Sequence, residues 1–104
     1  MPPMKRLELH NLLVATIGSN AVYFQPPETV KMEYPCIVYN LAYIDTSSAD
    51  DGTYITHYRY ELTYITRDPD DKNIENIKNL SAIKFDRYYS ADNLHHYSYE
   101  MTMY

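Results

Sequence analysis

The stretch 54-YITHYRYELTYITR-67 decides the fold of this chain. One alternating set of its residues is mostly aromatic: Tyr54, Thr56, Tyr58, Tyr60, Leu62, Tyr64 and Thr66. The other set carries the charges: Ile55, His57, Arg59, Glu61, Thr63, Ile65 and Arg67. Because side chains alternate across a strand, the pattern predicts one β-strand with an aromatic face and a charged face. Extended, it spans roughly 45 Å, far more than an ordinary strand, so we expect it at the centre of a sheet.

A hairpin partner for this strand precedes it in the chain. Residues 36–44 are apolar on both faces near their start, which is typical of a strand in the interior of a sheet. The polar residues 45–53 are expected to form the loop at the tip of an antiparallel hairpin. The hairpin is longer than one small domain needs, so we expect it to reach past the subunit core and contact a neighbour.

Two helices are predicted to cover the aromatic face. In residues 4–17, a leucine-rich stripe recurs at helical spacing and is widened by two further residues: Leu9, Leu12, Leu13 and Ile17, then Leu7 and Val14. The second helix is expected to begin with Asp68 as its cap and Pro69 in its first turn. Its apolar stripe is Ile74, Ile77 and Leu80, and it ends near Asn79.

The remaining strands complete an α+β domain. A short strand is expected at 21–24, another at 82–86 that continues toward residue 89, and a turn at 90–94. The chain from His95 onward alternates again, with Tyr97, Tyr99, Met101 and Met103 on one face. The predicted order is α-β-β-β-α-β-β, with two helices on a mostly antiparallel sheet and residues 1–104 in a single domain.

Composition excludes several classes of function. Nine Lys and Arg against fourteen Asp and Glu give a net charge of −5, which disfavours binding through nucleic-acid phosphates or an anionic membrane. The single cysteine, Cys36, fits a reducing compartment, and neither a signal-peptide pattern nor a membrane-spanning run is present. We therefore expect a soluble protein made in a cytosol.

No residue pattern predicts catalysis or a bound cofactor. His95 and His96 are adjacent on a strand and should point to opposite faces, so they are poorly placed to share a metal. Cys36 starts an apolar strand and is expected to be a small buried residue. Only two glycines occur, which leaves no phosphate-binding loop. The prediction is a protein that is not an enzyme, with no cofactor, metal or small-molecule substrate.

The predicted functional residues form a candidate subunit interface. His57, Arg59, Glu61 and Thr63 on the charged face fit an ordinary solvent face and a protein interface equally well. Asp50 and Asp51 belong to the expected hairpin tip. Pro26 and Pro27 belong to residues 25–35, whose prolines exclude a regular element and predict a surface arm or binding loop. The thirteen tyrosines favour a β-rich fold or an interface over base stacking.

Several segments together resemble the tail-completion, or head–tail joining, proteins of long-tailed bacteriophages. After the leucine-rich helix they are VYFQPP (22–27), YPCIVY (34–39), the long strand with its tyrosines and arginines, RDPD (67–70) and FDRYYSADNLHH (85–96). Their order and spacing over most of the chain carry the resemblance.

The resemblance implies a structural virion protein of the phage neck, synthesised in the bacterial cytoplasm. Such a subunit forms a homo-oligomeric ring, commonly a hexamer, that caps the tail tube and joins it to the head connector. Its partners would be other copies of itself, the major tail tube protein and the head completion or connector protein, with DNA only as passing cargo and no membrane. Two alternatives stay open: a head-side connector of the same neck, and a small single-stranded nucleic-acid-binding domain that uses its sheet tyrosines.

Overall fold

The structure, a computed structural model, describes residues 6–26, 31–48 and 54–103. Its elements follow the predicted order: α1 (Arg6–Ile17), β1 (Val22–Phe24), β2 (Cys36–Ser48), β3 (Tyr54–Thr66), α2 (Lys72–Lys78), β4 (Ile83–Ala91) and β5 (Leu94–Met103). The α+β class, with two helices and a mostly antiparallel sheet, is confirmed.

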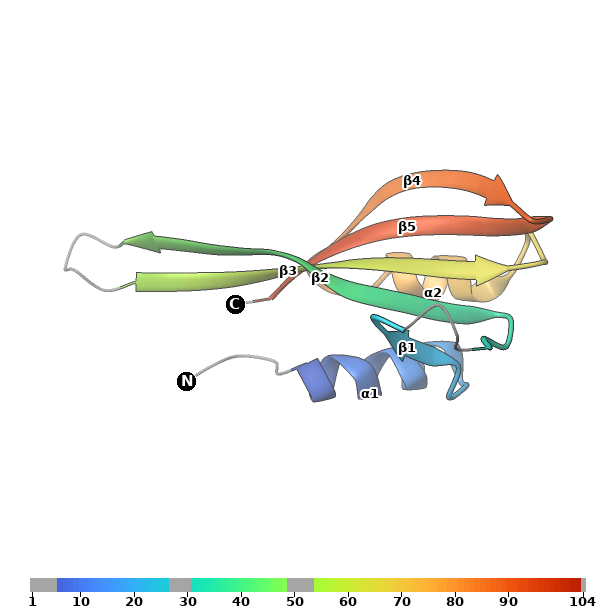
Figure 1. The fold of residues 1–104 in the computed structure, drawn as a ribbon, viewed down its shortest axis with the longest axis horizontal. Coiled ribbons are helices and arrows are strands. Elements are labelled where there is room, and N and C mark those ends of the chain that lie inside the picture. The colour runs from blue at the N-terminus through green and yellow to red at the C-terminus, as the bar shows by residue number, and fades with distance from the viewer. Residues whose placement is uncertain (1–5, 27–30, 49–53, 104) are drawn as a thin grey trace.

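The five strands form one sheet in the order β1-β2-β3-β5-β4 (Figure 1). β3 lies in the middle, as its length predicts, and β2 lies inside the sheet between β1 and β3. Only β1 and β2 run parallel, through Val22 opposite Ile37, whereas every other neighbouring pair is antiparallel. The edge strands of the sheet are therefore the short β1 on one side and the nine-residue β4 on the other.

The main core lies between the helices and the aromatic face of the sheet. Alternate residues of β3 enter it, and Tyr60, Leu62 and Tyr64 are buried as predicted. α1 contributes Leu9 and Leu13, while Ile77 is the buried residue of α2. One expectation is wrong: Leu7 does not widen the core face of α1 but is 60% exposed. Leu7 is two residues before the buried Leu9, which places it on the opposite side of α1 from the residues that pack on the sheet.

The opposite face of the sheet, here called the open face, has a small cluster at one end. Ala21, Cys36 and Ile65 are buried there, and Met32 and Tyr34 pack against them. The described part of the proline-rich connection therefore folds back on its own sheet, which corrects the expectation of a surface arm. The apolar side chains of Met32 and Tyr34 account for this, since they cover surface that would otherwise be exposed to water.

The β2–β3 hairpin extends beyond the rest of the sheet. Among the described residues, β3 pairs with β5 only from Tyr58 to Thr66, whereas residues 54–57 pair with residues 45–48 of β2. These two four-residue segments, here called the hairpin arm, project to the left in Figure 1, and the molecule measures 51 Å along its longest axis. The expected loop at 45–53 was too long, because Asp45 and the three residues after it continue the ladder opposite His57 and its neighbours.

α2 begins later than predicted, and so does the final turn. Asp71 is the N-cap of α2 and accepts a hydrogen bond from the Asn73 amide, whereas Asp68 accepts one from the Asp70 amide in the turn before it. Both aspartates suit a cap, and the hydrogen bonds that Asp71 receives from β3 decide between them. The expected turn at 90–94 reduces to Asp92 and Asn93, which both have positive φ, as a two-residue hairpin turn requires.

Candidate interface surfaces

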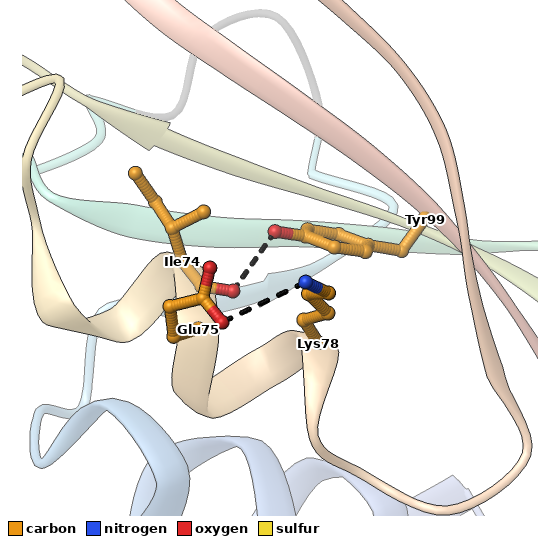
Figure 2. Close-up of polar contacts among 4 residues, drawn as sticks. All are labelled: Ile74, Glu75, Lys78 and Tyr99. Carbon is orange, nitrogen blue, oxygen red and sulfur yellow. Dashed lines mark hydrogen bonds and ion pairs between the residues drawn. The ribbon is translucent and has the colours of Figure 1, made fainter.

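Figure 2 shows how α2 is fixed to the sheet on the helix-covered side. The Tyr99 hydroxyl donates to the Ile74 carbonyl at 3.1 Å, and Lys78 pairs with Glu75 at 3.8 Å. Burial raises the pKa of Tyr99 to about 12, with the charge of Glu75 adding to the effect, so the phenol remains a hydrogen-bond donor at ordinary pH. This side of the sheet is thus occupied by the protein's own helices over β2, β3 and β5.

On the open face, the strand register places polar side chains in rows across the sheet. One row consists of Asn40, Glu61, Glu100 and Lys84, and the next of Val38, Thr63, Ser98 and Arg87. Arg59 and Thr102 follow beside a shallow hollow that Ile83, Lys84 and Glu100 also line. This surface is a sheet of mixed charge that no helix covers.

The structure brings three of the predicted interface residues together and places His57 and Pro26 apart from them. Arg59, Glu61 and Thr63 lie on consecutive open-face positions of β3, while His57 lies on the hairpin arm. Pro26 is half-buried just after β1, beyond the other edge of β2. Pro27, Asp50 and Asp51 lie outside the described residues.

Two carboxylates face each other in the middle of the open face. Glu61 and Glu100 are direct cross-strand partners, and neither forms an ion pair with any described residue. Like charges placed directly opposite each other on neighbouring strands destabilise a sheet. Lys84, directly opposite Glu100 on β4, is the cation of the same row.

Exposed apolar residues gather where the hairpin arm leaves the sheet. Tyr43, Ile44 and Tyr58 are 52%, 51% and 36% exposed. The Arg59 guanidinium lies over the Tyr43 ring at 5.5 Å, which holds that ring on the open face. Ile44 and Tyr58 are cross-strand partners on the helix side, at the end of the core where Tyr58 lies opposite the buried Met103.

The outer strand β4 carries a second exposed aromatic group that was not predicted. Phe85, Tyr88 and Tyr89 are 47%, 49% and 39% exposed. Tyr88 stacks on His95 and donates or accepts a hydrogen bond with its Nδ1 at 2.6 Å, whereas Tyr89 stacks on His96 on the open face. The adjacent tyrosines were the available signal, because neighbouring residues of an edge strand cannot both enter one core.

The titratable groups of the described residues show no catalytic arrangement. Cys36 is fully buried, and burial raises the pKa of its thiol to about 11, so it is a poor nucleophile. Within residues 6–26, 31–48 and 54–103, no three His, Cys, Asp or Glu side chains are grouped to hold a metal. The histidines at 95 and 96 lie on opposite faces, each stacked on a tyrosine.

No protein-family model matches the chain, and no curated protein sequence matches it. Among the described residues, no helix is both long and apolar enough to span a membrane.

Proposed function

We propose that this chain is a structural subunit of a phage neck: a tail-completion protein that forms a ring, caps the tail tube and joins it to the head connector. The observation that carries the proposal is the hairpin arm. Two paired strands extend beyond the last contact with β5 and carry exposed Tyr43, Ile44 and Tyr58 at their base. An isolated two-stranded hairpin is marginally stable in water, so an arm of this kind gains most by packing against another protein.

The remaining surfaces support an assembly role. The open face of the sheet presents Arg59, Glu61 and Glu100 without covering helices, and charged pairs across an interface set partner choice and register. The net charge of −5 suits a subunit that surrounds DNA without binding it tightly. The segments that resemble tail-completion proteins, from 22–27 to 85–96, supply the specific role.

Electron microscopy of the purified protein tests the proposal. Rings with a central opening, and a mass near six times the 12.3 kDa of one chain by mass photometry, are expected. Binding to a purified tail tube protein rather than to a head connector would assign the ring to the tail side of the neck. A compact monomer that binds neither partner would contradict the proposal.

A single-stranded nucleic-acid-binding domain is the second candidate, and the exposed rings of β4 favour it. Tyr89 is 39% exposed on the open face and Arg87 lies over its ring at 5.3 Å, which resembles part of a stacking platform. Its acidic charge opposes it, because such domains follow the backbone with basic residues. An anisotropy titration with labelled oligonucleotides at low salt separates the two: the neck subunit should cause no shift.

A further inference from the structure

We propose that the hairpin arm of one copy pairs in an antiparallel manner with the outer edge of β4 in a second copy, which joins the sheets of neighbouring subunits into one. This inference rests on the proposed ring and names the surface through which the ring forms. Five features support it in turn: free edges, strand direction, backbone phase, matching side chains and charge.

Both edges that would meet are free of a strand partner in the described chain. β1 covers β2 only opposite Ile37, Val38 and Tyr39, so β2 beyond Leu41 has β3 on one side alone. β4 is the last strand at the other end of the sheet, and eight of its nine residues are exposed. Unpaired edges expose backbone N–H and C=O groups that a further strand can satisfy.

The strand directions allow the contact to repeat from copy to copy. β2, β3, β5 and β4 are successive antiparallel neighbours, so β4 runs opposite to β2. A second copy placed beside the first in the same orientation therefore presents β2 antiparallel to β4, with the helices of both copies on the same side. Such a head-to-tail contact builds a ring when the rotation closes. The hairpin arm lies beyond the start of β4 (Figure 1). Pairing the arm with β4 therefore shifts each copy along the strand direction relative to the copy before it. Strands are staggered in the same way in barrels whose strands tilt against the axis.

The backbone N–H and C=O groups of the two strands point outward at positions that match for this pairing. In the β4–β5 hairpin the turn is Asp92-Asn93, so alternate residues including Tyr88 direct their N–H and C=O groups outward. In β2, Tyr39 and Leu41 bond outward to Gln25, and the bulge after Leu41 moves the outward positions to Ile44 and Thr46. Ile44 can therefore pair directly with Tyr88 through the backbone.

This register brings chemically matched side chains together. With Ile44 opposite Tyr88, antiparallel pairing places Asp45 opposite Arg87 and Tyr43 opposite Tyr89. Ile44 and Tyr88 both lie on the helix side and are each about half exposed, so the pairing buries apolar surface there. Asp45 and Arg87 both lie on the open face, because their cross-strand partners His57 and Ser98 do.

Charge makes the match selective. The described residues of the arm and its base, 43–48 and 54–58, contain one aspartate, Asp45, and no lysine or arginine, whereas β4 carries Lys84 and Arg87 on its open face. Charges and a bulge on an edge strand discourage indiscriminate pairing. An edge that presents Arg87 is therefore best suited to a strand that places an acidic residue opposite it.

A charge exchange tests the contact. Asp45→Arg and Arg87→Asp should each weaken self-association about tenfold or more in sedimentation experiments, because each places like charges opposite each other. The double variant restores an opposite pair at every contact and should recover assembly. Asp70→Arg and Lys72→Glu, on exposed positions outside the contact, are the matched controls and should assemble like the parent chain.

The outcomes separate this inference from the proposed function. If the parent chain forms rings and both single variants assemble equally well, or the double variant stays as weak as the single ones, the arm does not meet β4 at Asp45 and Arg87. The ring would then stand without this contact. If circular dichroism shows every variant folded, and the parent chain stays monomeric at the highest attainable concentration and binds neither the tail tube protein nor the head connector, both proposals fall.

Discussion

The Tyr64 hydroxyl donates a hydrogen bond to Asp71 Oδ2 at 2.6 Å, which joins the central strand to the N-cap residue of α2. Thr66 Oγ1 donates to the same oxygen at 3.0 Å, and Asp71 Oδ1 accepts from the Asn73 amide at 3.0 Å. The Asn73 side-chain amide also reaches the Ile17 carbonyl at the end of α1. The Asp71 carboxylate thus fixes α2 to β3, and the Asn73 side chain connects α2 to the end of α1.

Replacing Tyr64 with phenylalanine should lower the free energy of unfolding by about 1.5–3 kcal/mol. The lost bond is made to a charged acceptor, and Tyr64 is fully buried, so water cannot replace the hydroxyl. Tyr23→Phe is the control: its hydroxyl accepts from the exposed Glu33 amide, where water can substitute. Urea unfolding measures both, and equal losses would contradict the role given to the bond with Asp71.

Acid should destabilise the fold through Asp71. Burial alone would raise the pKa of this carboxyl, but the hydrogen bonds from Tyr64, the Asn73 amide and Thr66 outweigh burial and hold the pKa below its ordinary value. A carboxylate with a lowered folded-state pKa stabilises the protein above its unfolded pKa, and this contribution disappears as the pH falls through the folded pKa. In the Asp71→Asn variant, the free energy of unfolding should fall less steeply than in the parent chain as the pH is lowered. An equally steep fall in both chains would show that other carboxylates cause the loss of stability in acid.

Truncating Ile77 to alanine should cost about 2–5 kcal/mol, the usual range for emptying a buried aliphatic site. Ile77 is 1% exposed and is the residue through which α2 enters the main core. Asn76→Ala, on the neighbouring exposed position, should change stability by no more than about 0.5 kcal/mol. Thermal unfolding of both variants compares them directly. Similar midpoints would mean that α2 packs less tightly than the structure indicates.

Cys36 should react with a thiol reagent only when the protein opens. Its side chain is fully buried, and burial raises the pKa of the thiol to about 11, so few thiolates form at neutral pH. The labelling rate should rise with denaturant in step with unfolding followed by circular dichroism. Fast labelling of the folded protein would contradict the packing of Ala21, Cys36 and Ile65.

The fold was largely predictable from the sequence because its strands alternate clearly. Tyr60, Leu62 and Tyr64 were assigned to the core by a simple period of two, and their burial follows from it. Strand ends were predicted less well, because Thr46 and Ser48 are as compatible with a loop as with a strand. Pairing with Thr56 and Tyr54 of β3 decides their conformation.

The candidate interface was only partly predictable. Arg59, Glu61 and Thr63 were found by alternation, whereas Glu100 and Lys84 join them only through the pairing of β3, β5 and β4. The exposed rings of β4 were missed because burial depends on whether a helix covers a strand, and sequence periodicity does not report that. Ile83 is the partly buried residue of β4 that packs against the main core, whereas Tyr88 and Tyr89 remain half exposed.

The most direct test of an assembly subunit is analytical ultracentrifugation of a chain without the hairpin arm. Tyr43 and Arg59 are cross-strand partners whose backbone groups face each other, so residues 44–58 can be replaced by an Asn-Gly turn that suits a two-residue hairpin. We predict that the shortened chain keeps the circular dichroism and cooperative unfolding of the parent but sediments as a monomer, while the parent forms a ring. A folded, shortened chain that still assembles into the same ring would contradict the central role of the arm.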